Sequence, residues 1–154
     1  MRLIVQRVQE ARVLIHKQLY SEIGPGLLVF LGIHKDDDSS QIKWFVNKLV
    51  HLRIFSDDEG KMNRSVKDIG GQILIVSQFT LYGNCLNGRR PDFIQVAPPS
   101  IAQSLYDQFI EQLYQEMDHI QTGVFGAEMQ IALVNDGPVT FLIEPEKKGD
   151  KVLF

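Results

Sequence analysis

The sequence predicts a single mixed α/β domain whose sheet is at least partly antiparallel. Apolar runs typical of strands occur before, between and after two segments with helical periodicity. The chain has 154 residues, which is about the length of one domain. Hydrophobic residues make up 44% of the chain and charged residues 23%, an ordinary globular composition. This composition excludes a disordered tail protein, a collagen-like repeat and a small disulfide scaffold.

The chain begins with segments that are typical of strands. Residues 2–8 form a short apolar run, and the alternating segment 11–20 is its expected partner. A Gly-Pro-Gly turn at 24–26 leads into 27–33. The unbroken apolar run at 27–33 is typical of a strand buried on both faces.

A helix is expected next. The acidic segment 36–40 offers capping side chains and negative charge for a helix start. Behind it, apolar residues recur at the spacing of one helix face: Ile42, Phe45, Val46, Leu49 and Val50. The acidic segment 56–60 is expected to form a turn.

A second buried strand and a second helix follow. The strand is predicted over 72–79, and a long polar loop over 82–91 follows it. Ser100 and Gln103 match a capping box, which predicts a helix start. In that helix one apolar row repeats every four residues: Ile101, Leu105, Phe109 and Leu113.

The last predicted element is a β-hairpin. Its strands are 129–134 and 139–143, and the residues at 135–138, Asn-Asp-Gly-Pro, form its turn. We therefore expect one domain over 1–144 and a charged, solvated tail over 145–154.

Several classes of protein are excluded or left open by these features. The longest apolar runs are far shorter than the ~20 residues that cross a bilayer. Gln6 and Arg7 interrupt the apolar N-terminus, which is therefore not expected to be a signal peptide. The single cysteine, Cys85, cannot form an internal disulfide, which fits a reducing cytoplasm. The net charge of −3 neither predicts nor excludes an RNA partner.

Three features could carry chemistry, and each also has a simpler structural interpretation. Ser77, Gln78 and Thr80 end a predicted strand, where their polar groups could hold a carbonyl or an ester. Such residues also end strands by satisfying local backbone groups. Arg89 and Arg90 could contact phosphates, or they could be solvated charges on a loop.

The third feature is the Gly137-Pro138 step. Its neighbours suit a tight turn, which is the simpler interpretation. A Gly-Pro step also permits a cis bond, which could hold two carbonyl oxygens in a fixed, parallel pose.

Two other possibilities have little support. Cys85 is a weak candidate nucleophile, because nothing in the sequence marks a neighbouring base that would form its thiolate. The four histidines share no metal-ligand spacing, so no metal site is expected.

The motif SQFT at 77–80, followed by NDGPVT at 135–140, resembles the paired signature of the D-aminoacyl-tRNA deacylases. The resemblance covers nearly the whole chain, including IVQRV at 4–8, EIGPGLLVFLGI at 22–33, RIFSDDEGKMN at 53–63, GRRPDF at 88–93 and TGVFGAEM at 122–129. One departure is Asp92, where the family commonly has serine. A carboxylate there weakens the case for a phosphate contact at Arg89 and Arg90.

The resemblance implies an enzyme that hydrolyses the ester between a D-amino acid and the 3′-terminal adenosine of tRNA. Such an enzyme spares L-aminoacyl-tRNA, which is chiral proofreading, and glycyl-tRNA mischarged on tRNA(Ala) is an implied second substrate. The resemblance also implies a cytoplasmic homodimer with no cofactor. We further expect no metal, no membrane and no DNA partner. Its implied fold has largely antiparallel sheets that curl into a barrel-like core with flanking helices.

The family pattern also implies roles for particular residues. Ser77, Gln78, Phe79 and Thr80 would line the pocket, with the N–H groups of Phe79 and Thr80 polarising the ester oxygen. Gly137 and Pro138 would form a rigid wall that reaches into the partner subunit's site. Arg7 would brace that wall, and three further residues would line the pocket: Phe125, Met129 and Ala102.

Catalysis is expected to rely on the tRNA's own terminal 2′-OH, which would help to activate water. Two alternatives stay open. One is a hydrolase in which Thr80 or Cys85 is the nucleophile, and the other is a non-catalytic RNA-binding dimer that uses Arg89 and Arg90.

Overall fold

A computed structural model describes residues 1–145 of the chain, so the predicted tail lies outside the described residues from position 146 onward. The strands are β1 (Arg2–Ile15), β2 (Gln18–Ile23), β3 (Gly26–Gly32), β4 (Phe55–Ser56), β5 (Met62–Arg64), β6 (Gln72–Ser77), β7 (Ile120–Thr122) and β8 (Gln130–Ile143). The helices are α1 (Ile42–His51) and α2 (Pro99–Tyr114), and two short 3₁₀ helices are η1 (Ser39–Gln41) and η2 (Phe79–Tyr82).

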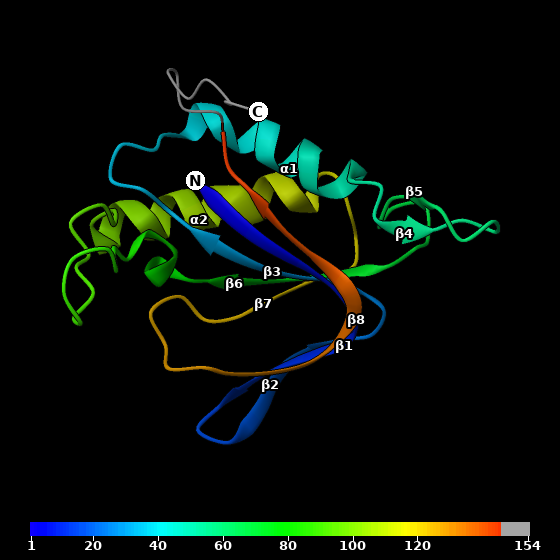
Figure 1. The fold of residues 1–154 in the computed structure, drawn as a ribbon, viewed down its shortest axis with the longest axis horizontal. Coiled ribbons are helices and arrows are strands. Elements are labelled where there is room, and N and C mark those ends of the chain that lie inside the picture. Colours follow the sequence, from blue (N-terminus) through cyan, green and yellow to red (C-terminus); the bar gives the residue numbers. More distant parts are fainter. Residues whose placement is uncertain (146–154) are drawn as a thin grey trace.

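The main sheet is mixed and strongly curved. Its strand order is β2-β1-β3-β6-β7, and β8 also pairs with β1. Strand β1 is antiparallel to β2, β3 and β8, whereas β3–β6 and β6–β7 are parallel pairs. Strands β1 and β8 curve together, so that the sheet curls into a nearly closed, barrel-like shape with both helices on one side (Figure 1). The predicted fold class is confirmed.

Both faces of β3 and β6 are buried. One face, with Leu27, Val29 and Leu31, packs into the larger core under α1 and α2. The other face contributes Leu28 to a smaller core, which is enclosed by the curled sheet together with Val8, Ala11, Val13, Ile23, Leu74 and Val76. The prediction of a strand buried on both faces is therefore confirmed. Within residues 1–145, no helix combines the length and the apolar character needed to cross a bilayer.

The prediction of separate strands at 2–8 and 11–20 is wrong. Residues 2–15 form the single strand β1, and the chain turns at His16 and Lys17, whose φ angles are +51° and +64°. Gln9 and Glu10, which lie between the two predicted strands, are exposed. They lie at a shift in the register with β8, which continues to pair beyond them.

The predicted hairpin at 129–143 is also wrong. Strand β8 is continuous and pairs along β1, so its two halves do not pair with each other. In this ladder Gln6 pairs with Thr140 and Val8 with Asn135, so residues 136–139 bulge out opposite the single residue Arg7. The Asn-Asp-Gly-Pro segment is therefore a bulge within a strand, because each half finds a better partner on β1.

The ends of three predicted elements differ from those in the structure. Helix α2 begins at Pro99 with Pro98 before it, and Ser100 makes no capping box, because proline itself suits the first helical position. Asp38 caps η1 through the Ser40 N–H, whereas Gln41 precedes α1 without a side-chain cap. Strand β6 ends at Ser77, two residues before its predicted end.

Candidate active site

A cavity of about 760 Å³ opens where β3 and β6 end. Four segments far apart in the sequence line it. These are the end of β3, the end of β6, residues 93–102 from the loop into the start of α2, and residues 125–131. Because β3 and β6 are parallel neighbours, Leu31 and Ser77 lie side by side at the same edge of the sheet.

Six of the residues selected from the sequence line this cavity: Ser77, Gln78, Phe79, Ala102, Phe125 and Met129. Ser77 and Gln78 are polar, whereas Phe79, Ala102, Phe125 and Met129 are apolar. The cavity therefore offers both hydrogen-bonding groups and apolar surface.

The segment after β6 turns sharply into η2. Gln78 precedes η2 with φ −144° and ψ 86°, and the first hydrogen bond of the turn runs from the Leu81 N–H to the Gln78 carbonyl at 3.3 Å. The first N–H groups of such a helix have no acceptor inside it, which leaves those of Phe79 and Thr80 available to a ligand. The Gln78 amide donates to the Thr80 hydroxyl. Thr80 is exposed and does not itself line the cavity.

Two aromatic rings lie at the mouth of the cavity. Phe79 is 56% exposed and Phe93 is 44% exposed, and their ring centroids are 5.2 Å apart. Phe93 was not selected as a site residue. Its signals in the sequence are an aromatic residue just after the polar loop 82–91 and its place at the end of GRRPDF at 88–93.

Tyr106 supports the cavity from the core. Its hydroxyl donates to the Ile75 carbonyl at 3.1 Å, and its ring centroid is 5.8 Å from that of Phe125. Burial raises the pKa of Tyr106 above its usual value, so the hydroxyl keeps the proton that it donates.

Few titratable groups are close to the cavity. Of the residues that line it, Glu128 alone has a side chain that titrates. Cys85 is exposed and lies outside the lining. Among residues 1–145, no three His, Cys, Asp or Glu side chains are grouped to hold a metal ion.

The Gly137-Pro138 segment lies outside this cavity, as does Arg7. Arg7 pairs with Leu27 on β3, whereas the cavity begins at Leu31, four residues further along that strand. At ~3.3 Å per residue this offset is ~13 Å. The Gly137–Pro138 peptide bond is cis, and both residues are exposed.

Arg89 and Arg90 are exposed on the loop after η2 and do not line the cavity either. The base of their loop is closed by an antiparallel bridge between Asn84 and Asp92. The Asp92 carboxylate accepts from the Asn84 amide at 2.9 Å and from the Ile94 N–H at 3.3 Å. Asp92 therefore closes the loop.

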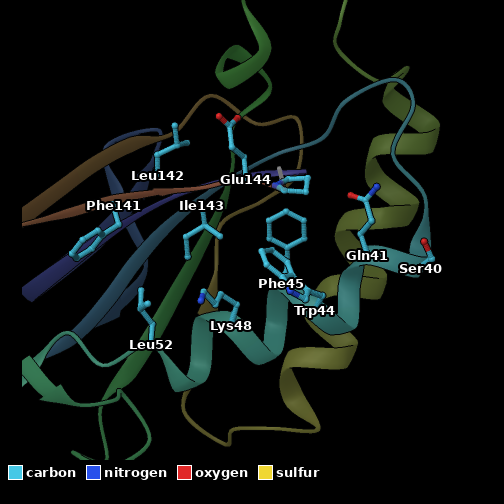
Figure 2. A pocket seen from close by; sticks show the side chains of 11 residues that line it. Ser40, Gln41, Trp44, Phe45, Lys48, Leu52, Phe141, Leu142, Ile143 and Glu144 are labelled. Carbon is cyan, nitrogen blue, oxygen red and sulfur yellow. The ribbon is translucent and has the colours of Figure 1, made fainter. Parts of the chain in front are cut away.

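A second cavity, of about 790 Å³, lies between α1 and the end of β8 (Figure 2). Trp44, Phe45 and Phe141 give it an apolar lining. It contains none of the predicted site residues within the described part of the chain.

The comparisons with known proteins agree with one another. The family model described as D-Tyr-tRNA(Tyr) deacylase matches residues 4–144. The D-aminoacyl-tRNA deacylase of Protochlamydia amoebophila (strain UWE25) is 64% identical over 144 residues, which is 94% of this chain and 95% of that protein. The protein of the same name from Chlorobaculum tepidum is 53% identical over 149 residues, covering 96% and 99%.

Two solved structures are also similar. The c-Myc DNA Unwinding Element Binding Protein superposes with a TM-score of 0.90 at 41% identity, over 96% of this chain and 100% of that one. A probable eukaryotic D-amino acid tRNA deacylase gives a TM-score of 0.81 at 20% identity, over 92% and 97%. The second likeness shows the fold alone.

Proposed function

This chain belongs to the D-Tyr-tRNA(Tyr) deacylase family, and we propose that it removes D-amino acids from tRNA by hydrolysing the ester to the 3′-terminal adenosine. Membership makes it a hydrolase that acts on carboxylic esters. The observation that carries the proposal is the cavity at the ends of β3 and β6, whose lining combines polar Ser77 and Gln78 with apolar side chains.

The ester carbonyl binds at the start of η2. The N–H groups of Phe79 and Thr80 donate to the carbonyl oxygen and stabilise the negative charge that develops on it when water attacks. The carbon–oxygen bond to the ribose then breaks, and the ribose oxygen leaves with a proton. The support for this step is that these two N–H groups have no acceptor within the turn.

Water is activated by the 2′-OH of the terminal adenosine. The Thr80 hydroxyl accepts from the Gln78 amide, which cannot act as a base, and Thr80 does not line the cavity. This contact favours the substrate-assisted mechanism over a Thr80 nucleophile. Cys85 lies outside the cavity lining, which disfavours it in the same way.

The terminal adenine stacks at the mouth of the cavity. The exposed rings of Phe79 and Phe93 offer an aromatic surface, and a stacked base is worth ~1–3 kcal/mol. Arg89 and Arg90 contact phosphates further along the acceptor end.

The enzyme acts as a homodimer in which Gly137 and Pro138 of each subunit complete the cavity of the other. Their bulge is exposed and is offset from the cavity of its own chain, which supports this arrangement. A rigid backbone wall there excludes the side chain of an L-amino acid. Glycine has no side chain to exclude, so glycyl-tRNA, including that mischarged on tRNA(Ala), is a second substrate. The reaction takes place in the cytoplasm and needs no cofactor.

The test is a deacylation assay with D-tyrosyl-, L-tyrosyl- and glycyl-tRNA side by side. We expect rapid release of D-tyrosine and glycine, with L-tyrosyl-tRNA spared. Equal rates on the two tyrosyl esters would contradict chiral selection. Binding of tRNA with no turnover would instead support the non-catalytic RNA-binding dimer. A DNA duplex belongs in the binding assay as well, because one relative is named for DNA binding.

A further inference from the structure

We propose that Arg2 is a positioning residue that holds η2 in place, and with it the N–H groups of Phe79 and Thr80 that face the ester. This inference rests on the proposed function. It concerns a residue at the other end of the chain from the motifs that define the site.

Arg2 contacts the last two residues of η2 directly. Its Nη1 donates to the Leu81 carbonyl at 2.6 Å. Its guanidinium carbon lies 4.7 Å from the centre of the Tyr82 ring, which is the geometry of a cation–π contact. One side chain therefore holds both the backbone and a ring of the turn.

The rest of the guanidinium is held by a carboxylate. Nε and Nη2 of Arg2 each lie 2.8 Å from Oε2 of Glu144, just after β8. The orientation of the guanidinium is thus fixed by three kinds of contact. Two of its N–H groups donate to one carboxylate, a third donates to a carbonyl, and its plane lies against the face of a ring. Lysine could reproduce only part of this set, because it has no planar fork.

The turn needs an outside support because its own bonds are few. A 3₁₀ helix has poorer hydrogen-bond geometry than an α-helix. The turn packs over Gly32, where an added Cβ would lie 2.9 Å from the Leu81 Cβ. Gly32 is the β3 partner of Arg2 in the ladder with β1. Arg2 therefore reaches the turn from the neighbouring strand, at the same level of the sheet.

The residue before Arg2 is fixed as well. Met1 is 1% exposed, and its ammonium nitrogen lies 2.5 Å from the Asp37 carboxylate. The backbone of Arg2 is thus held from both sides, by this ion pair and by the β1 ladder. Its side chain needs little reorganisation to reach Leu81.

The test compares Arg2→Met and Arg2→Lys with wild type and with Arg12→Met as a matched control. Arg12 lies on the same strand and is 47% exposed, and its ion pairs within residues 1–145 are with the surface residues Glu10 and Glu22. Steady-state kcat and KM on D-tyrosyl-tRNA are measured below the melting temperature of every variant. In parallel, amide hydrogen exchange is followed at Leu81 and Gly83, whose N–H groups bond within the turn.

We expect Arg2→Met to lower kcat by about tenfold or more, since losing one oxyanion donor costs ~10²-fold. KM should stay within about twofold, exchange at Leu81 and Gly83 should quicken, and Arg2→Lys should recover part of kcat. Arg12→Met should change none of these. A wild-type kcat in Arg2→Met, or a change in KM alone, would overturn the inference. An inactive wild type would refute the proposed function instead, and unchanged amide exchange in Arg2→Met would still overturn the positioning role.

Discussion

Arg7 and Asp136 are joined twice, since the Arg7 Nε lies 2.8 Å from the Asp136 carboxylate and 3.2 Å from its backbone carbonyl oxygen. The other end of the same guanidinium donates to the Ile54 carbonyl at 2.5 Å. Arg7 is 9% exposed and faces the bulge in the ladder between β1 and β8. One buried side chain therefore ties the segment that carries Gly137 and Pro138 to the chain just before β4.

Arg7→Met should destabilise the protein and loosen that segment. The buried Ile54 carbonyl loses its charged donor, which costs ~1–3 kcal/mol of unfolding free energy. If the segment forms the chiral wall, the ratio of D- to L-tyrosyl-tRNA hydrolysis should fall as well. Urea denaturation and the paired rates measure the two effects. Arg7→Met with wild-type stability would show that the Ile54 and Asp136 contacts contribute little.

Removal of either candidate nucleophile should leave the reaction running. Thr80→Val and Cys85→Ala should each keep deacylation within about tenfold of wild type, because no base contacts either group in the described structure. A substrate that ends in 2′-deoxyadenosine should react far more slowly. An acyl adduct on Thr80, trapped and found by mass spectrometry, would establish the alternative.

Gly137→Ala should reduce activity on every substrate without unfolding the domain. The new Cβ would lie 2.8 Å from the Asn135 amide nitrogen, which is on a movable side chain. The cost to stability should therefore be about 1 kcal/mol or less. In the proposed dimer the added methyl projects toward the partner's ester site and blocks D-tyrosyl- and glycyl-tRNA alike. Unchanged rates on both substrates would remove Gly137 from the site.

Gly32→Ala should displace η2, which packs over Gly32. Its Cβ would lie 2.9 Å from the Leu81 Cβ and 3.2 Å from the Gln78 carbonyl oxygen, so the turn must move. Overpacking of this kind costs ~1–3 kcal/mol, and kcat should fall. Gly24→Ala is the control, because the nearest atom to its Cβ would be a glutamine side-chain oxygen at 3.5 Å. Equal effects of the two substitutions would argue against a specific contact with η2.

The Met1 amino group should make stability depend on pH. Burial lowers its pKa below the ordinary 8.0, against the opposing effect of Asp37. Between that lowered pKa and 8.0 the unfolded chain binds more protons than the folded one, so the unfolding free energy rises with pH across this window. Urea denaturation at several pH values tests this. A variant with one extra N-terminal glycine should not show this rise of the unfolding free energy with pH. A wild type whose unfolding free energy falls relative to that variant as the pH rises would contradict the prediction.

Periodicity located most elements because it reports local contacts. The apolar row of 42–50 gave the helix α1, and the unbroken run of 27–33 gave the buried strand β3. The motif at 77–80 placed Ser77, Gln78 and Phe79 correctly at the end of a buried strand. These features depend on residues within a few positions of one another, which a sequence displays directly.

Which strands pair with one another depended on the whole fold. The alternation in 130–134 and 139–143 suits a hairpin as well as it suits two lengths of one strand, and only the position of β1 decides between them. The contact between Arg2 and Leu81 joins residues 79 positions apart, and nothing local to either residue predicts it. The sequence by itself determined most of the elements and the motif. The tertiary structure decided which strands pair, where the bulge forms and which side chains share the cavity, because those contacts form only when distant segments pack together.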